Sequence, residues 1–428
     1  MGLARIEYSN NMEIGKTIEQ VVKEGLCTGC GTCVSLCPQD AIEMVINKSK
    51  GIYVPQLDRE RCNECGICLD VCPGHSVDFK GLNSEVFGRE PEDIFLGNYL
   101  KCYIGHAIDY DIRYNSASGG LVTALLIFAL EEGLIDGALV TRMSEENPLE
   151  PQPFIARTRK EIISAAKSKY CPVPVNVALK EILNEEGRFA IVGLPCHIHG
   201  VRKAELANKK LKERIALHMS IFCSHSPSFL ATEYVLHRIG VRKEKVKGLD
   251  YRGEGWPGSM KVSLEEGEVS VLLPDYWAGG FGTCFRPQRC TMCCDKTSEL
   301  ADVSFGDAWL HELKNDEIGI SVIISRSEIG ESLLNAAESQ ERIELEGIDR
   351  GKMVLSQSTD FKKLVTPQIF FHGLFGKKAP IYNTELVRPN FMAYFRGLLA
   401  CLQRGLGSRR YLWFLIPGLI WFAKKLRI

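Results

Sequence analysis

Two runs of closely spaced cysteines stand out near the start of the sequence. They read CTGCGTCVSLCP from Cys27 to Pro38 and CNECGICLDVCP from Cys62 to Pro73. The repeated spacing, C-x2-C-x2-C-x3-C-P, is typical of chains that hold two [4Fe–4S] clusters, each with three thiolates from one run and a fourth from the other. Zinc is the alternative, but zinc sites rarely use interlocked cysteines in such numbers. We predict two ligand sets: Cys27, Cys30, Cys33 and Cys72, and Cys62, Cys65, Cys68 and Cys37.

Later cysteines occupy positions that suit a third cluster. Cys196 follows the predicted strand FAIVG, and Cys223 follows the predicted strand IALHMSIF. Ligands of open parallel sheets bind outside the carboxyl ends of the strands, so both thiols are expected at one crevice. Cys290 and Cys293, in CFRPQRCTMCCD, have metal-ligand spacing. Each alone would more often be a buried structural cysteine, but together we predict that Cys196, Cys223, Cys290 and Cys293 bind a cluster.

Other side chains beside these cysteines have secondary roles. Cys284 or Cys294 could replace one of the four ligands. His197, His199 and His225 are neighbours of the cysteines in the sequence. Because imidazole beside such a site more often donates a hydrogen bond, we expect these histidines to contact sulfur or a cofactor and not to bind metal.

The segment SASGG, residues 116–120, offers a different kind of binding group. It opens the predicted helix SASGGLVTALLIFALEEG, with Ser116 or Ser118 as the expected N-cap. Hydroxyls and unobstructed backbone N–H groups at a helix N-terminus suit a phosphate. The alternative is an ordinary cap followed by glycines that allow close packing. We predict that a cofactor contacts Ser116, Ser118, Gly119 and Gly120.

The elements that position these groups fall into two domains. AIEMVI and GIYVPQLD are predicted strands around the turn NKSKG, so 20–80 should form an α+β domain of the two-[4Fe–4S] ferredoxin type. Residues 81–94 are expected as a polar linker. From 95 to 390, strands such as GALVTR, ADVSFG and ISVIIS alternate with helices, which favours an α/β domain with a mostly parallel sheet. Residues 391–428 form an apolar and basic tail.

Composition limits the partners and the compartment. The chain has 428 residues, with 52 Lys and Arg against 53 Asp and Glu, so it has no global attraction to nucleic acid. Its 17 cysteines cluster as metal ligands do. The N-terminal sequence MGLARIEYSNNMEIGKT lacks the apolar core of a secretory signal. We therefore expect a cytoplasmic protein with reduced thiols and no nucleic-acid partner.

The C-terminal sequence YLWFLIPGLIWFAKKLRI is apolar and then basic. Its uncharged run, from Tyr411 to Ala423, is short for a membrane span. A helix lying in the membrane interface fits better, with Trp413 and Trp421 as anchors and basic side chains at the lipid head groups. The alternative is a terminal helix packed on the protein or on a partner subunit. The tail is thus a candidate for peripheral contact with the inner face of a membrane.

Taken in order, several segments resemble the beta subunit of the coenzyme F420 (deazaflavin) hydrogenases and dehydrogenases. With the ferredoxin-type runs, they cover most of 20–330. The segments are SASGG at 116–120, SKYCP at 168–172, VGLPCHIHGVR at 192–202, IFCSHSPS at 221–228 and CTMCCDKTSELADVSFGDAW at 290–309.

The resemblance implies an FAD bound in the α/β domain, close to an iron–sulfur cluster. Lys169 and Tyr170 are then expected to contact the flavin together with SASGG. The implied enzyme is a coenzyme F420-dependent oxidoreductase that transfers hydride between reduced coenzyme F420 and FAD. Electrons would pass singly through the [4Fe–4S] clusters to ferredoxin, to another redox partner protein, or to other subunits of a hydrogenase/dehydrogenase-type complex. The alternatives are the same machinery acting on another organic substrate, and a non-catalytic electron-relay subunit.

Overall fold

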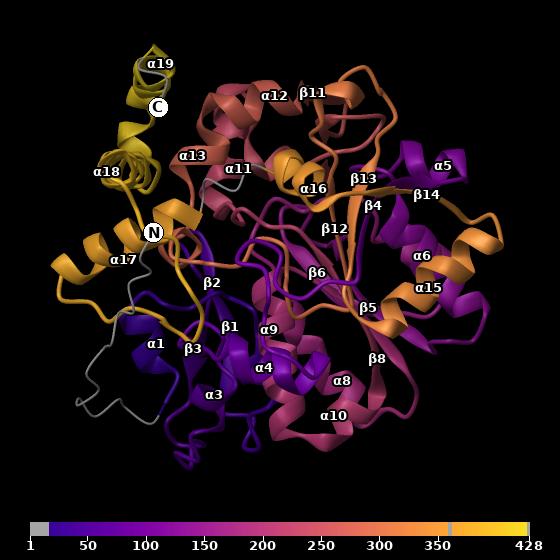
Figure 1. The fold of residues 1–428 in the computed structure, drawn as a ribbon. Coiled ribbons are helices and arrows are strands. Elements are labelled where there is room, and N and C mark those ends of the chain that lie inside the picture. Colours follow the sequence, from indigo (N-terminus) through magenta and orange to yellow (C-terminus); the bar gives the residue numbers. More distant parts are fainter. Residues whose placement is uncertain (1–16, 358–361, 426–428) are drawn as a thin grey trace.

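The computed structural model describes residues 17–357 and 362–425, whose arrangement is shown in Figure 1. The N-terminal module contains the cysteine repeat. Its two longer strands, β1 and β2, pair antiparallel and form the hairpin that AIEMVI and GIYVPQLD predict. The elements of this module are α1 (Glu19–Lys23), α2 (Thr32–Ser35), β1 (Ile42–Asn47), β2 (Ile52–Leu57), α3 (Ile67–Asp70), β3 (Ser76–Val77) and α4 (Phe79–Phe87).

The range expected as a linker is partly helical. Helix α4 ends at Phe87 and so occupies the first half of 81–94. Phe79 and Leu82, three residues apart, are both buried. Because residues at this spacing lie on the same face of a helix, α4 can dock in spite of its polar composition. Residues 81–87 therefore belong to a packed helix and not to a linker.

The second unit is built on an eight-stranded sheet with the order β14-β4-β13-β12-β8-β7-β5-β6. Its central strands, β12, β8, β7 and β5, are parallel, as the alternation of strands and helices predicts. The flanking strands run antiparallel to their neighbours. The strands are β4 (Lys101–Ala107), β5 (Gly137–Met143), β6 (Pro151–Ala156), β7 (Phe189–Gly193), β8 (Ile215–Ile221), β12 (Val303–Asp307), β13 (Ser321–Ser325) and β14 (Ile343–Ile348).

Helices cover both faces of this sheet (Figure 1). Along β5, Ala138 and Val140 pack in the cluster that contains α6, whereas Leu139 packs in the cluster that contains α9. Successive strand residues point to opposite faces, so this apolar run suits a strand buried on both sides. The longer helices of this unit are α6 (Leu121–Glu131), α9 (Pro195–Ala207), α11 (Phe229–Arg238) and α15 (Glu328–Ser339).

Shorter elements complete the second unit. A separate three-stranded sheet has the order β11-β10-β9. Its strands are β9 (Gly248–Asp250), β10 (Ser259–Ser263) and β11 (Glu268–Leu272). The short helices are α5 (Tyr110–Tyr114), α7 (Arg159–Ser164), α8 (Leu179–Asn184), α10 (Lys209–Arg214), α12 (Leu273–Tyr276), α13 (Gly282–Cys284), α14 (Gln288–Thr291) and α16 (Arg350–Gln357).

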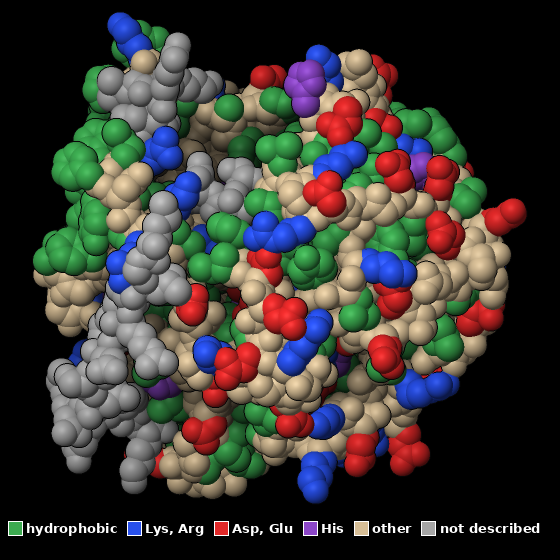
Figure 2. Space-filling view, viewed as in Figure 1, with side chains coloured by type: hydrophobic (Ala, Val, Ile, Leu, Met, Phe, Trp, Pro, Cys, Tyr) green, Lys and Arg blue, Asp and Glu red, His purple; other side chains and the backbone are tan. Residues whose placement is uncertain are grey.

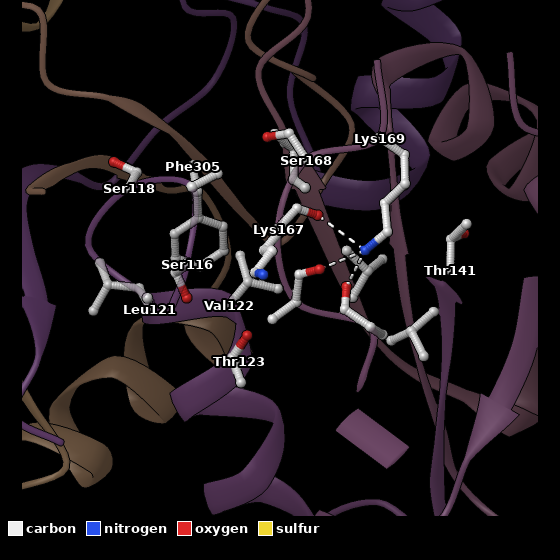
Figure 3. A pocket seen from close by; sticks show the side chains of 18 of the residues that line it. Ser116, Ser118, Leu121, Val122, Thr123, Thr141, Lys167, Ser168, Lys169 and Phe305 are labelled. Atoms are coloured by element: carbon white, nitrogen blue, oxygen red, sulfur yellow. Dashed lines mark hydrogen bonds between the residues drawn. The ribbon is translucent and has the colours of Figure 1, made fainter. Parts of the chain in front are cut away.

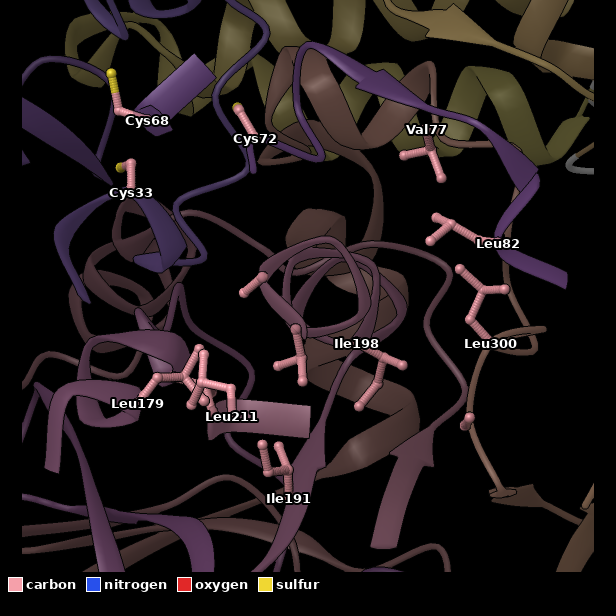
Figure 4. Packing of buried hydrophobic residues seen from close by; sticks show 14 of the residues in the cluster. Cys33, Cys68, Cys72, Val77, Leu82, Leu179, Ile191, Ile198, Leu211 and Leu300 are labelled. Carbon is pink, nitrogen blue, oxygen red and sulfur yellow. The ribbon is translucent and has the colours of Figure 1, made fainter. Parts of the chain in front are cut away.

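The two units share one hydrophobic cluster, part of which Figure 4 shows. Val77 and Leu82 of the N-terminal module belong to the same cluster as Leu179, Ile191 and Ile198 of the α/β unit. A continuous apolar core between two units resists their separation, because separating them would expose it to water. The module is therefore fixed to the α/β unit through a common core.

Asn176 forms the polar part of this junction. Its Nδ2 donates to Thr32 Oγ1 at 2.8 Å and to His197 O at 2.9 Å, and its backbone N–H donates to Cys30 O. Gly200 of α9 lies against the same contact, where a Cβ atom would be 2.2 Å from Thr32 Oγ1. Residues from both units thus interlock beside the cysteines.

The C-terminal part returns to the N-terminal module and then forms a separate layer of helices. Strand β15 pairs with β3 in parallel. In the part of the chain that the structure describes, none of the helices is both long and apolar enough to cross a bilayer. The C-terminal elements are α17 (Lys362–Leu374), β15 (Ile381–Tyr382), α18 (Phe391–Gly407), a 3-10 helix at Arg410–Leu415 and α19 (Ile416–Lys425).

One predicted membrane anchor belongs to the core. Trp413 is only 8% exposed, its Nε1 donates to Gly407 O at 2.9 Å, and its ring packs edge-on against Tyr234 and Phe285. The prediction of Trp413 as an anchor is wrong, because a single helical turn can bury one aromatic residue and expose the next. Trp421 is exposed.

Candidate redox site

The cysteines of the N-terminal repeat form two groups in space. In each run a glycine with positive φ, Gly31 or Gly66, precedes a one-turn helix that carries a cysteine. The grouping matches the interlocked pairing expected from the spacing, and cluster ligation itself remains a prediction. The first ferredoxin cavity is lined by Cys27, Cys30, Cys33 and Cys72, and the second by Cys37, Cys62, Cys65 and Cys68.

A third cavity brings together the later cysteines. Cys196 lies in the first turn of α9, Cys223 follows β8, and Cys290 and Cys293 come from α14 and the turn after it. All four line one cavity, called here the third cysteine cavity. The parallel strands β7 and β8 end at the same edge of the sheet, which is why residues distant in sequence meet there.

The alternative ligands lie away from this cavity. Cys284 packs in an apolar cluster with Phe281 and Phe285, and its carbonyl lies against Gly407 of α18. Cys294 is buried in the core that joins the two units. Neither residue is among those lining the third cysteine cavity.

Four thiols around one cavity fit the donor set of a [4Fe–4S] cube, in which each thiolate binds a different iron. Within 17–357 and 362–425, no group of three or more His, Cys, Asp or Glu side chains is arranged to hold a single metal ion. Burial raises the pKa of Cys72 and of Cys293 to about 11. Since an iron ligand must be a thiolate, cluster assembly would release protons from these thiols.

A buried cation, Arg289, and a partly buried one, Lys203, accompany the cysteines. Arg289 donates from Nε to Gly74 O at 3.1 Å and from Nη2 to Pro73 O at 3.2 Å, and it lines the third cysteine cavity. Lys203 donates to Cys72 O at 2.9 Å. A cluster with thiolate ligands carries net negative charge, and buried charge is costly unless it is compensated. These cations therefore favour an anionic group at the cysteines.

A larger cavity, called here the SASGG cavity, opens where α6 begins (Figure 3). It measures about 190 Å³. Leu121, Val122 and Phe305 supply part of an apolar wall, and Thr123 and Thr141 supply hydroxyl groups. Of the predicted cofactor contacts, the cavity is lined by Ser116, Ser118, Gly120 and Lys169.

The two serines do not cap α6. The N-cap residue is Gly120, with φ 76°. Ser116 Oγ donates to Ile112 O at 2.6 Å, and Ser118 Oγ donates to Ile320 O at 2.8 Å. The hydroxyls thus hold the loop in shape. The first N–H groups of a helix have no partner within it, so those of α6 remain suited to an anion beside the cavity.

Gly119 has a packing role instead of the predicted cofactor contact. Its N–H already donates to Ser321 Oγ at 3.0 Å. A Cβ atom at Gly119 would lie 2.6 Å from Gly105 O and 2.9 Å from Ser321 N. The glycine is needed because the loop crosses the sheet at backbone contact distance, which sequence alone does not distinguish from a phosphate contact.

The two remaining predicted cofactor contacts, Lys169 and Tyr170, have different settings. Lys169 Nζ donates to the carbonyls of Ala165 at 2.6 Å and Ala166 at 2.5 Å (Figure 3), and burial lowers its pKa to about 7. Its amine therefore holds the loop around the cavity. Tyr170 lies outside the cavity lining, with its ring 4.9 Å from that of Trp277.

Two charged residues of this cavity, Lys167 and Arg252, were not predicted from the sequence. Lys167, adjacent to SKYCP, lines the cavity with an uncommon φ of 72° and pairs with Asp250 at 2.6 Å. Arg252 also lines the cavity, is buried and pairs with Asp307 at 2.9 Å. Trp256 Nε1 also donates to Asp307. Only the fold brings these loops together.

The cavities share walls. Val173, Leu194 and His197 line both the SASGG cavity and the third cysteine cavity. His197 Nδ1 accepts from Leu194 N–H at 3.0 Å, and Nε2 donates to Val173 O at 3.0 Å, so this ring contacts backbone and not sulfur. Thr28 and Pro73 line both the third cysteine cavity and the first ferredoxin cavity. One layer of residues thus separates each cavity from the next.

A cysteine module of the two-cluster type, joined to an α/β unit, defines an iron–sulfur electron-transfer protein. Residues 26–75 match the model of the 4Fe-4S dicluster domain. Residues 102–180 and 186–351 match the N-terminal and C-terminal models of the coenzyme F420 hydrogenase/dehydrogenase beta subunit. The chain belongs to this family of coenzyme F420-related iron–sulfur oxidoreductase subunits.

Individual relatives agree. The coenzyme F420 hydrogenase subunit beta of Methanococcus voltae is 30% identical over 261 residues, 59% of this chain and 86% of that protein. The coenzyme F420-dependent sulfite reductase of Methanocaldococcus jannaschii is 28% identical over 347 residues, 78% of this chain and 49% of that protein. A chain of the F420-reducing [NiFe] hydrogenase complex from Methanosarcina barkeri has a TM-score of 0.53 and 25% identity, covering 70% of this chain and 99% of that chain.

Proposed function

We propose that this chain exchanges a hydride between coenzyme F420 and an FAD in the SASGG cavity. Electrons then pass singly through a cluster in the third cysteine cavity to the N-terminal module, and on to ferredoxin or a partner subunit. The observation that carries the proposal is the row of cavities with shared walls. Such a row holds successive carriers close together without any large movement of the protein.

The residues of the SASGG cavity suit one part of a flavin dinucleotide. Ligand pockets usually measure about 300–1,000 Å³, so a cavity of about 190 Å³ encloses part of FAD. Its apolar wall suits a flat ring, and the start of α6 suits a phosphate. When bound, a flavin takes up a hydride and gives its electrons singly.

The chain's own residues position and isolate the carriers. His197 is buried, and burial lowers its pKa to about 4, so a neutral ring stands in the wall between two cavities. Leu194 and Val173 complete this wall. The wall excludes water while keeping the two cofactor sites adjacent. No residue is assigned as a general acid or nucleophile, because positioning is what hydride and electron transfer require.

The iron content of anaerobically purified protein tests the third cluster. Three cubes correspond to about twelve irons per chain. Cys290→Ser should leave about eight irons and retain the flavin, because Cys290 lines only the third cysteine cavity. Reduced coenzyme F420 should then still reduce the flavin, while the ferredoxin-type clusters stay oxidised. Cys401→Ser, in α18, is the matched control. Unchanged iron in Cys290→Ser would refute the third cluster.

Flavin binding has its own test. Thr141→Trp adds a large ring inside the SASGG cavity, whereas Gln152→Trp adds one at an exposed position of the neighbouring strand. We expect Thr141→Trp to lose most of its flavin absorbance with unchanged iron, and Gln152→Trp to keep both. Protein that takes up no flavin on reconstitution would instead support an electron-relay subunit.

A second candidate keeps the machinery and changes the substrate. The match to the coenzyme F420-dependent sulfite reductase spans 78% of this chain but 49% of that protein. A similar sequence therefore forms about half of a relative whose name includes a further reaction. Turnover of reduced coenzyme F420 with an artificial electron acceptor separates the candidates: no oxidation of the coenzyme by flavin-loaded protein would favour another organic substrate.

A further inference from the structure

Helix α18 exposes an apolar stripe to solvent. Ala393 and Gly397 are buried, and a Cβ atom at Gly397 would lie 3.1 Å from both Pro367 and Phe371 of α17. The opposite face is apolar as well, at the i, i+4, i+7 and i+11 spacing of a single helix face. This exposed stripe consists of Phe391, Phe395, Leu398 and Leu402.

The 3-10 helix and α19 also have a buried inner side and an exposed apolar outer side. Trp413 and Ile416 point into the body of the protein and are buried. The outward residues of the 3-10 helix and α19 are aromatic, with Phe414 75% exposed and Trp421 63% exposed. We call the outward apolar residues of α18, the 3-10 helix and α19 the tail surface. Its members are Phe391, Phe395, Leu398, Leu402, Tyr411, Phe414, Trp421 and Phe422.

The tail surface lies at one margin of the molecule. The C-terminal helices form a layer beside the α/β unit (Figure 1), and hydrophobic side chains gather along that margin over α17 and α18 (Figure 2). Contiguous exposed apolar surface of this kind usually marks an interaction site. The buried inner faces exclude the simple explanation that the segment is an undocked end of the chain.

The C-terminal segment is strongly basic. Between 377 and 425 the sequence has a single acidic residue, Glu385. Lys425 Nζ lies 5.0 Å from the ring centroid of Trp421, so a cation adjoins an aromatic member of the tail surface. The chain as a whole is nearly neutral. The basic residues in the same range are Lys377, Lys378, Arg388, Arg396, Arg404, Arg409, Arg410, Lys424 and Lys425.

We propose that the tail surface binds the surface of an anionic lipid bilayer, with its aromatic side chains at the level of the lipid head groups. Amphipathic helices with aromatic residues on one face and Lys and Arg around it bind in this way. The excess of basic residues complements anionic lipids. An interfacial position needs no membrane span, and the proposal is independent of the proposed redox chemistry.

Substitutions on the outer face test this better than truncation does. Trp413 and Ile416 pack with Tyr234 and Phe281 in one buried cluster, so removing the segment would open the core. Phe414→Ser combined with Trp421→Ser changes only exposed side chains.

The measurement is co-sedimentation of the full-length protein with vesicles of phosphatidylglycerol and phosphatidylcholine, or of phosphatidylcholine alone. We expect binding to the anionic vesicles, weakened by salt, and about tenfold weaker in the double variant. Leu355→Ser with Ile329→Ser, exposed apolar residues elsewhere, should bind like the wild type. Iron and flavin contents should be unchanged in both variants.

Three results would overturn the proposal. The first is wild-type protein that stays in solution with anionic vesicles. The second is equal binding to both kinds of vesicle, because the charge would then be irrelevant. The third is a dimer, measured by light scattering without lipid, that the double variant abolishes while vesicle binding is absent in both proteins. That result would assign the tail surface to a second copy of the chain.

Discussion

A buried ionic network connects helix α9 and strand β8, which position Cys196 and Cys223 at the third cysteine cavity. His218 of β8 contacts Asp302 at 3.0 Å through Nδ1 and Glu205 of α9 at 2.6 Å through Nε2. Arg202 of α9 lies 3.2 Å from Glu205 and 3.5 Å from Asp302. Helix α9 begins beside Cys196, and β8 leads to Cys223. The network therefore helps to set the distance between these thiols.

Replacing His218 by leucine should be strongly destabilising. The His218 side chain is 3% exposed, and removing one partner of a buried ion pair costs about 3–5 kcal/mol. Burial and Arg202 disfavour protonation, but Glu205 and Asp302 outweigh them and hold the pKa of His218 above its usual value. The leucine variant leaves Glu205 and Asp302 with Arg202 as the one remaining cation of this network, although Asp302 keeps its hydrogen bond from the backbone N–H of residue 218.

The sign of the pH dependence follows from the raised pKa. The folded protein binds the His218 proton more tightly than the unfolded chain, so its contribution is full below about pH 6.5, the usual histidine pKa. It is lost as the pH rises through the folded-state pKa of His218. The difference in unfolding free energy between wild type and His218→Leu should therefore shrink at alkaline pH.

Anaerobic chemical denaturation at pH 6 and pH 9 measures this difference. His237→Leu, at an exposed position of α11, is the control and should change stability little. Iron analysis of His218→Leu should in addition show partial loss of the third cluster, since α9 and β8 are no longer held together. A difference below about 1 kcal/mol at pH 6, or one that is equal at both pH values, would refute the reasoning.

Two further predictions concern the junction and the SASGG cavity. Gly200→Ala would place a Cβ atom 2.2 Å from Thr32 Oγ1 and should cost about 1–3 kcal/mol while making the N-terminal module easier to proteolyse; Gly373→Ala, which meets nothing within 4 Å, should do neither. Arg252→Met removes the buried partner of Asp307 and should lower the unfolding free energy by about 3–5 kcal/mol. Adding Asp307→Asn should recover part of this loss, and a double variant less stable than Arg252→Met would contradict the pairing.

The local spacing of residues in the sequence predicted much of the fold and part of the candidate site. The cysteine repeat predicts its two spatial groups because short loops bring cysteines three residues apart to one side. The strands β7 and β8 were predictable because apolar runs such as FAIVG suit strands buried on both faces. The position of Cys196 and Cys223 at one sheet edge followed from those strands. These inferences need only neighbouring residues and the rules of parallel sheets.

Inferences that depend on distant contacts were less successful. In sequence, Gly119 resembles a phosphate contact. The structure requires a glycine there because the backbone oxygen of Gly105, in strand β4, lies too close for a side chain. Trp413 resembles a membrane anchor, yet Tyr234 covers it. In each case the partner lies where no local pattern indicates it.

The order of the cavities is a property of the same kind. Thr28 and Pro73 flank cysteines of the N-terminal repeat, while Val173 and Leu194 belong to separate loops of the α/β unit. Val173 and Leu194 form a wall within the α/β unit, and the docking of the N-terminal module makes Thr28 and Pro73 the wall to the next cavity. A module attached through a flexible linker would have the same cysteine motifs without a fixed route for electrons. The common core of the two units is therefore part of the redox function, because it determines which cavity adjoins which.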